Sequence, residues 1–247
     1  MKRTLILIIA ATVATVARAQ LFDTSAAQVE LVASLLGTGR VFSANIAVTR
    51  ERHNKQARIS DNVLHLRGAD LRIEHKLAAD PALAKLTARL KKRDLAEVIT
   101  ILLPRQNKAY LILPAKKSYL ESPVVADGDA KQKPRTESKL LRLENLDGHP
   151  CAVRRLTFVA ADDSKQEIVI WEATDLQGFI LKSEMDHGDD TMEVLRFTNI
   201  KFDPPGDDKF TAPAQYRKLS PDNMNSIADV MSEFNLDRDA AVADMLR

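Results

Sequence analysis

Apolar and polar side chains alternate with a period of two through most of the chain, and turn residues interrupt the alternation at short intervals. The first clear stretch has its apolar members at Phe42, Ala44, Ile46 and Val48. A period of two places successive apolar side chains on one face of a β-strand. The sequence therefore predicts a chain built mainly of strands.

We predict about ten strands, and short turns join the last five of them, as in an antiparallel meander. Their ranges are 42–49, 62–67, 71–77, 98–103, 109–113, 139–146, 151–159, 167–173, 179–185 and 191–202. The sheet is expected to end at Pro204-Pro205. A sheet of this size seldom stays flat, so we expect a mainly β (α+β) fold, a strongly curved antiparallel sheet.

Three segments have helical patterns that suit the concave side of such a sheet. One covers residues 23–37, and a short one follows Asp80-Pro81, where proline suits the first helical turn. The third begins at Ser220-Pro221 and continues as a helical extension over 220–247. Its apolar stripe indicates docking on its own sheet, contact with a partner or contact with a membrane surface. Between Ser122 and Arg135 the apolar pattern lapses, as it does in a domain linker or a surface loop. We expect a surface loop, because the strand pattern resumes beyond it, so that 20–219 form one domain.

The first nineteen residues have the pattern of a cleaved signal peptide. Lys2 and Arg3 precede an uncharged apolar run, and Ala17-Arg18-Ala19 supplies small residues at the cleavage site, leaving Gln20 first in the mature chain. The apolar run is too short for a stable membrane anchor. We therefore expect a secreted protein, periplasmic in a Gram-negative bacterium, and not an integral membrane protein.

Charge argues against nucleic acid as a partner. The whole chain has 36 basic and 34 acidic side chains. Loss of Lys2, Arg3 and Arg18 with the signal leaves 33 basic against 34 acidic side chains. A mature protein without a basic excess does not attract a polyanion over its whole surface.

The sequence offers no strong catalytic or metal-binding motif, so we expect no enzyme, cofactor or metal site. Cys151 is the only cysteine, and His149 stands two residues before it, which leaves a thiol hydrolase as a remote alternative. A buried strand residue is the more typical role for a lone cysteine. The acidic turn around His187 lacks the ligand spacing of a calcium loop.

Six short motifs resemble the LolA-like superfamily of periplasmic proteins. That group includes the outer-membrane lipoprotein carriers and sigma-factor regulators of the RseB kind, and the likeness is nearest to an uncharacterised branch. The motifs are Phe42-Ser43-Ala44-Asn45, Leu71-Arg72-Ile73-Glu74, Ala109-Tyr110-Leu111-Ile112 before Lys117-Ser118-Tyr119, the run from Asn145 to Cys151, the run from Ile170 to Phe179, and the run from Phe210 to Tyr216.

The resemblance implies an unclosed half-barrel with helices over its concave side and an apolar cavity between them. Arg72 falls near a position where the family has a basic residue. The aromatic candidates below also suit an ordinary core, and the sequence leaves both roles open. The candidate cavity residues are Phe42, Ile46, Ile73, Phe158, Trp171, Phe179, Phe197 and Arg72.

Two functions follow from the resemblance. One is a non-enzymatic carrier or binder of a lipid, acyl chain or lipoprotein. The other is a protein-interaction or envelope-stress sensing module with an envelope protein as its partner, which a cavity filled by the protein's own side chains would favour.

Overall fold

The computed structural model describes residues 40–124, 135–159, 165–186 and 190–220. The predicted signal peptide, the helical pattern over 23–37, most of the predicted loop and the helical extension from residue 221 lie outside these described residues.

The described residues form one twelve-stranded sheet with the order β12-β6-β5-β4-β3-β2-β1-β11-β10-β9-β8-β7. The strands are β1 (Val41–Arg52), β2 (Lys55–Arg67), β3 (Asp70–Lys76), β4 (Glu97–Leu103), β5 (Lys108–Leu113), β6 (Ser118–Ser122), β7 (Arg135–Leu146), β8 (His149–Val159), β9 (Lys165–Ala173), β10 (Phe179–Asp186), β11 (Met192–Lys201) and β12 (Arg217–Lys218).

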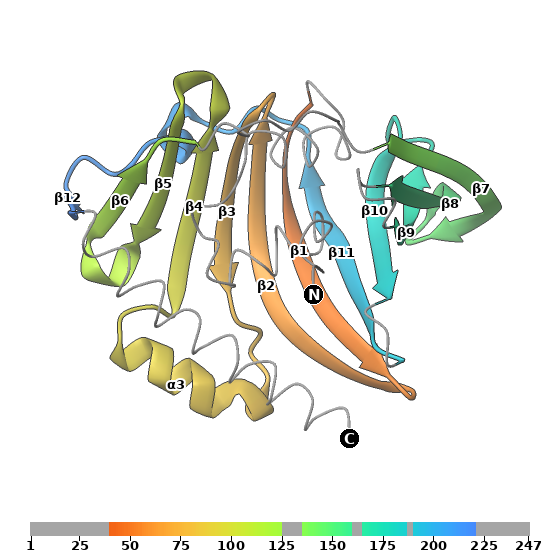
Figure 1. Ribbon diagram of the computed structural model, residues 1–247, viewed down its shortest axis with the longest axis horizontal. Coiled ribbons are helices and arrows are strands. Elements are labelled where there is room, and N and C mark those ends of the chain that lie inside the picture. The colour runs from red at the N-terminus through yellow and green to blue at the C-terminus, as the bar shows by residue number, and fades with distance from the viewer. Residues whose placement is uncertain (1–39, 125–134, 160–164, 187–189, 221–247) are drawn as a thin grey trace.

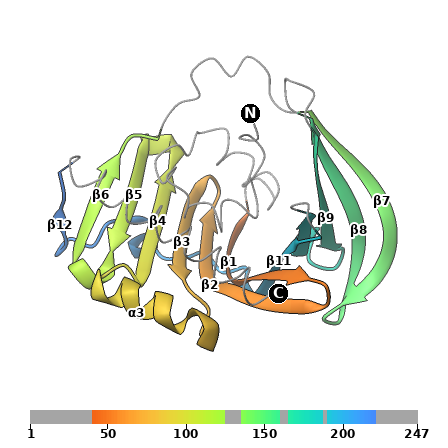
Figure 2. The same cartoon turned by 60° about the horizontal axis from the view of Figure 1, so that its bottom comes forward.

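The sheet is strongly curved and does not close on itself. Figure 2 shows it as a trough, with β4, β5 and β6 in one wall and β7, β8 and β9 in the other. The predicted mainly β fold and the unclosed half-barrel are confirmed. One pairing differs from the prediction, because β12 lies beyond Pro205 and runs parallel to β6. The sheet is therefore mixed, and it does not end at the two prolines.

The two halves of the trough meet at a seam between β1 and β11. Ile46 pairs with Phe197 and Val48 with Leu195 across this seam. On one side of it β1 to β6 follow one another as antiparallel neighbours, and on the other side β11 to β7 do the same. Each half is thus a meander of neighbouring strands. The short turns in the sequence predicted this arrangement for the second half.

Apolar side chains cover both faces of part of the sheet. Most members of a large apolar cluster, among them Leu64, Ile73 and Leu195, lie on the inner, concave face, and this part is called the inner cluster below. On the outer face of β4 and β5 a smaller cluster surrounds Phe210, which belongs to a 3₁₀ turn at Asp207–Phe210. This second cluster explains why β4 is almost continuously apolar, since a strand buried on both faces loses the alternation.

A short helix, α3 (Ala84–Lys92), lies against one end of the inner face, as Figure 1 shows below β3 and β4. It follows a 3₁₀ turn at Pro81–Leu83, in agreement with the predicted proline start. Leu86 and Leu90 are buried and join the inner cluster. The helix ends where the backbone nitrogen of Leu95 donates to the carbonyl of Leu90, past a left-handed Asp94 with φ 58°.

Candidate functional site

Most of the predicted cavity residues lie on the inner face, but they are spread over it and buried. Phe42 and Ile46 belong to β1, Ile73 to β3, Phe158 to β8 and Phe197 to β11. Each is at most 3% exposed and belongs to the inner cluster. In the described residues these side chains pack against one another as a core does.

Phe179 is the centre of an aromatic group at one end of this cluster. Its ring centroid lies 4.9 Å from that of Phe42 and 5.7 Å from that of Phe197, with nearly perpendicular planes. Phe202 approaches the same ring at 5.8 Å from the end of β11 and is 48% exposed. Edge-to-face contacts of this kind stabilise a core beyond the area that they bury.

Arg72 lies on the outer face, opposite its neighbours Leu71 and Ile73. Its Nη2 and Nε donate to Glu74 Oε1 at 2.9 and 3.0 Å, and its Nη1 donates to the carbonyl of Lys209 at 3.0 Å. Arg72 therefore fastens the segment around Phe210 to the outer side of the sheet and contacts no inner-face residue through these bonds.

Trp171 also faces outward. It pairs with Lys182 of β10, and Lys182 pairs with Arg196 of β11. Arg196 lies between the inner-face residues Leu195 and Phe197, so its side chain and those of its partners point to the other face. The Lys182 ammonium lies 4.3 Å from the Trp171 ring centroid and the Arg142 guanidinium 5.7 Å from it. The indole Nε1 donates to Glu144. Trp171 is thus buried on the convex side beneath the charged side chains of Lys182, Arg142 and Glu144.

These contacts lower the pKa of Glu144. The hydrogen bond from Trp171 contributes most, followed by the hydrogen bond from Arg142. A carboxyl whose pKa is lowered in the folded state stabilises it above the unfolded pKa, and this stability is lost as pH falls through the folded pKa. We expect the emission of Trp171, the only tryptophan, to shift in acid at a pH below the ordinary glutamate pKa of 4.5. Glu144→Gln should abolish the transition and reduce stability by about 1 kcal/mol. A fluorescence titration with the same transition in both proteins would contradict the assignment.

Several polar side chains lie within the inner apolar face, and no sequence motif indicated them. They are Asn62, His75, Thr100, Ser118 and Ser183, placed on the inner face by their cross-strand partners. The sequence indicates their face only through the period of two along a strand. His75, for example, is two residues from Ile73 and four from Leu71, so it lies on the same face as both.

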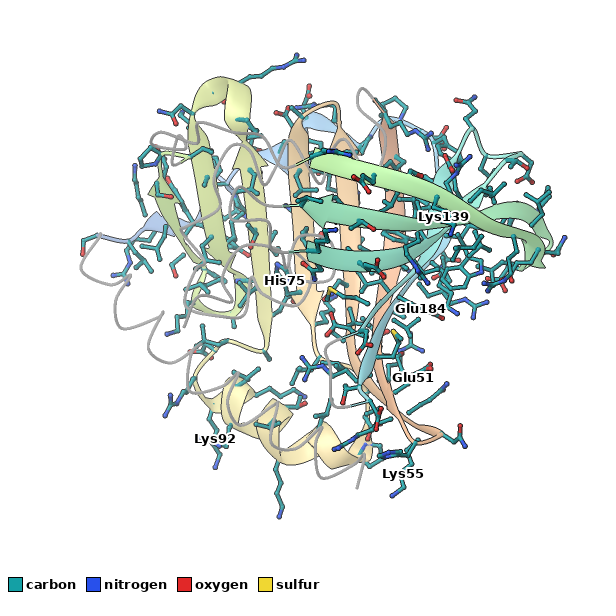
Figure 3. All side chains as sticks on the ribbon, turned by 45° about the vertical axis from the view of Figure 1, so that its right-hand side comes forward. Glu51, Lys55, His75, Lys92, Lys139 and Glu184 are labelled. Carbon is teal, nitrogen blue, oxygen red and sulfur yellow. The ribbon has the colours of Figure 1, made fainter. Side chains whose placement is uncertain are left out.

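His75 is the titratable member of this set, and Figure 3 labels it on β3, to the left of the arrows of β8 and β9. Its Nε2 lies 3.3 Å from Thr100 Oγ1. Burial lowers the pKa of His75 to about 4, because the charged imidazolium loses its hydration there. His75 is accordingly neutral at pH 7.

The thiol and the histidine of the hydrolase alternative do not have the geometry of a catalytic pair. Cys151 is 2% exposed, and its Sγ donates to the backbone carbonyl of His149 at 3.4 Å. Burial raises the pKa of this thiol, which disfavours the nucleophilic thiolate. The imidazole Nδ1 of His149 lies 2.8 Å from Asp175 Oδ2 instead. No pattern in the sequence indicates Asp175 as that partner. Asp175 follows β9, and the pairing of β9 with β8 brings it next to His149.

Strand β7 forms one edge of the sheet and is exposed along most of its length. Its register with β8 places Leu140 and Leu143 on the inner face and Lys139 and Arg142 on the outer one. The two leucines are 49% and 74% exposed, which makes them the most exposed large aliphatic side chains among the described residues.

No cluster of three or more histidine, cysteine, aspartate or glutamate side chains in the described residues has the arrangement of a metal site. Among the same residues, no helix has the length and apolarity needed to span a membrane.

Similar solved structures share little sequence with this chain. An uncharacterized conserved protein from Thermus thermophilus is 12% identical, with a TM-score of 0.45 and coverage of 77% of this chain and 94% of that one. A LolA superfamily protein from Nitrosomonas europaea is 14% identical, with a TM-score of 0.34 and coverage of 76% and 97%. The lipoprotein LppX from Mycobacterium tuberculosis is 13% identical, with a TM-score of 0.39 and coverage of 73% and 95%.

The structures similar to this one thus include a member of the LolA superfamily, the group that the sequence motifs resemble. No family model matches the chain, and no curated protein matches its sequence. At these identities and TM-scores the likeness assigns no function to the chain.

Proposed function

We propose that this protein is a non-enzymatic periplasmic binder or carrier of an apolar ligand, such as a lipid, an acyl chain or a lipoprotein. In this proposal residues 1–19 are removed on secretion, 20–219 form the binding domain and 220–247 form a helical extension. The observation that supports it most is the inner face, where one apolar cluster extends from Leu120 of β6 to Phe158 of β8.

Such a face suits an acyl chain on energetic grounds. Transfer of an acyl chain from water onto apolar side chains is favourable by about 0.8 kcal/mol for each methylene. About ten methylenes would give several kcal/mol after the cost of ordering the chain. The exposed Leu140 and Leu143 extend the apolar face to the rim of the trough, where a chain would first make contact.

Cys151 is poorly suited to covalent catalysis. Its thiol is buried and its pKa is raised, so it is a poor nucleophile. We expect Cys151→Ala to leave ligand binding unchanged.

A second candidate is a docking module for an extended segment of an envelope protein. Two observations favour it: the predicted apolar cavity residues are at most 3% exposed, as in a filled core, and β7 is an edge strand. A strand with a partner on one side alone, as β7 has among the described residues, offers backbone hydrogen bonds to an added strand. Leu140 and Leu143 would supply apolar contacts on one side of that strand.

Mass spectrometry of organic extracts from the secreted protein tests the first candidate, followed by titration with a dansylated C11 fatty acid. We expect bound lipid and saturable uptake of the probe. The double variant Leu140→Ser, Leu143→Ser should bind the probe several-fold more weakly, whereas Lys139→Ser, on the outer face of the same strand, should not change it. An empty protein that also takes up no fatty acid would exclude the carrier and favour docking at β7.

A further inference from the structure

Helix α3 and the residue after it carry a dense group of positive charges. Within ten residues they contain five basic side chains, Lys85, Arg89, Lys91, Lys92 and Arg93. Asp94 is the only acidic residue between positions 81 and 96, and the chain outside residues 84–93 has 31 basic and 34 acidic side chains. Positive charge is therefore concentrated at this helix, and such an uneven distribution orients a protein in front of a charged surface.

The basic side chains of α3 are exposed. Leu86 and Leu90 are buried in the inner cluster and hold the helix against the sheet. Lys85, Arg89 and Lys92 share another side of the helix, and all three are exposed. Figure 3 labels Lys92 on the side of α3 that faces away from the sheet. Because a helix rises by about 1.5 Å for each residue, this row is about 10 Å long.

The turn between β5 and β6 adds two more lysines at the same end of the sheet. Helix α3 leads into β4, and β5 runs antiparallel to β4 and ends at Leu113. The turn at Pro114–Lys116 therefore lies at the end of the sheet where α3 lies, as Figures 1 and 2 both show. Lys116 and Lys117 are exposed there. We call α3, Arg93 and residues 114–117 the basic end.

Ion pairing distinguishes the basic end from the strands. On the strands many basic side chains have a carboxylate beside them, as Arg142 has Glu144 and Arg154 has Glu172. At the basic end, five lysines form no ion pair within the part of the chain that the structure describes: Lys85, Lys91, Lys92, Lys116 and Lys117. Their charge is therefore available to an anion from outside the molecule.

An anionic lipid bilayer suits this surface. A helix with one basic face and one apolar face is typical of segments that lie on membranes. Here the leucines of α3 are buried against the sheet, so contact with lipid would be electrostatic, without insertion of the helix into the hydrocarbon. Each lysine close to an anionic membrane strengthens binding by about fivefold, so several together support reversible docking.

We propose that the basic end docks this protein on the surface of an anionic phospholipid membrane. Docking in this way brings the end of the trough that α3 covers next to the lipid headgroups. It requires no lipid on the inner face, so it is independent of whether the protein is a carrier.

Flotation of the mature protein with vesicles tests the proposal. One set of vesicles contains phosphatidylcholine alone, and the other contains equal parts of phosphatidylcholine and phosphatidylglycerol. We expect binding to the anionic vesicles only, and its loss when salt is raised from about 0.05 M to about 0.5 M, because salt screens exposed charges. The triple variant Lys85→Gln, Lys91→Gln, Lys92→Gln should bind at least about twentyfold more weakly.

A second triple variant, Arg105→Gln, Lys139→Gln, Lys201→Gln, is the matched control. It removes the same charge from exposed positions away from the basic end, with Arg105 at the opposite end of β4. We expect its affinity for the anionic vesicles to change by less than about twofold, because charges far from the surface are screened. Neither triple variant should alter the uptake of the dansylated fatty acid, which separates this docking from the proposed carrier function.

Three results would overturn the proposal. The first is no binding to the anionic vesicles, and the second is an equal loss in both triple variants, which would mean attraction by the whole surface. The third is binding of polyglutamate without binding of vesicles, which would assign the basic end to an acidic protein partner.

Lysine acetylation of the wild-type protein keeps the test decisive if a variant does not fold. Mass spectrometry compares the acetylation of each lysine with and without the anionic vesicles. We expect the vesicles to protect Lys85, Lys91 and Lys92 and to leave Lys139 and Lys201 unchanged. Equal protection of all five lysines would overturn the proposal.

Discussion

Phe179→Ala should be among the most destabilising single substitutions in this protein, with a loss of about 4 kcal/mol in the free energy of unfolding. Truncation of a buried phenylalanine typically costs about 3–5 kcal/mol, because apolar contact is lost and a cavity remains. Here the removed ring has three edge-to-face neighbours, Phe42, Phe197 and Phe202. Urea denaturation followed by circular dichroism measures the change.

Phe202→Ala is the matched control, because its ring belongs to the same group but is 48% exposed. We expect it to cost about 1 kcal/mol, in proportion to the smaller area that it buries. If both substitutions cost the same, the aromatic group would not be a core element, and Phe179 would be better viewed as a lining residue with space beside it.

His75 should make the protein less stable in mild acid. Its pKa is near 6.5 in the unfolded chain and about 4 in the folded one. Above pH 6.5 both states are neutral at this residue and it contributes nothing. Below that pH the unfolded state takes up the proton first, so stability falls as pH falls, until the folded state also binds the proton near pH 4. The total loss over this window is about 3 kcal/mol.

Comparison with His75→Gln isolates this contribution. We expect the difference in unfolding free energy between wild type and variant to change by about 3 kcal/mol from pH 7 to pH 4, in favour of the variant in acid. His53→Gln removes an exposed histidine, with 65% of its side chain accessible, and serves as the control. Parallel stability curves for wild type and His75→Gln would show that His75 is hydrated in the folded protein.

The sequence predicts the strands well where one face is buried and the other is polar, as in β1 and β10. It misses β6, because five residues rich in serine and tyrosine give no clear alternation, and it misses β12, which has only two residues. Nor does it predict the β1–β11 seam. Alternation tells which face a residue occupies within a strand, but the choice of a distant neighbour depends on packing over the whole sheet.

The same distinction explains the candidate residues. Phe42, Ile46 and Ile73 follow the alternation of their strands and lie on the inner face. Arg72 follows it too, and it lies on the outer face for that reason. Trp171 follows three consecutive apolar residues, Ile168 to Ile170, so alternation does not reveal its face; the register with β10 does. A pocket of about 430 Å³ lined by Arg40, Asp175 and Phe202 joins three segments far apart in the chain, and no local pattern relates them.

The seam between β1 and β11 also bears on when this protein can fold. Ile46 has Phe197 as its neighbour, so the middle of the trough cannot form until the chain has been made as far as Phe197. Pairings between segments so distant in sequence form slowly, because a long loop must close first. The two meanders are local and can form early, but each would expose at the seam a strand edge that only the other covers. A nascent chain of this kind exposes an unpaired strand edge for longer than one whose first strand finds both of its partners at once.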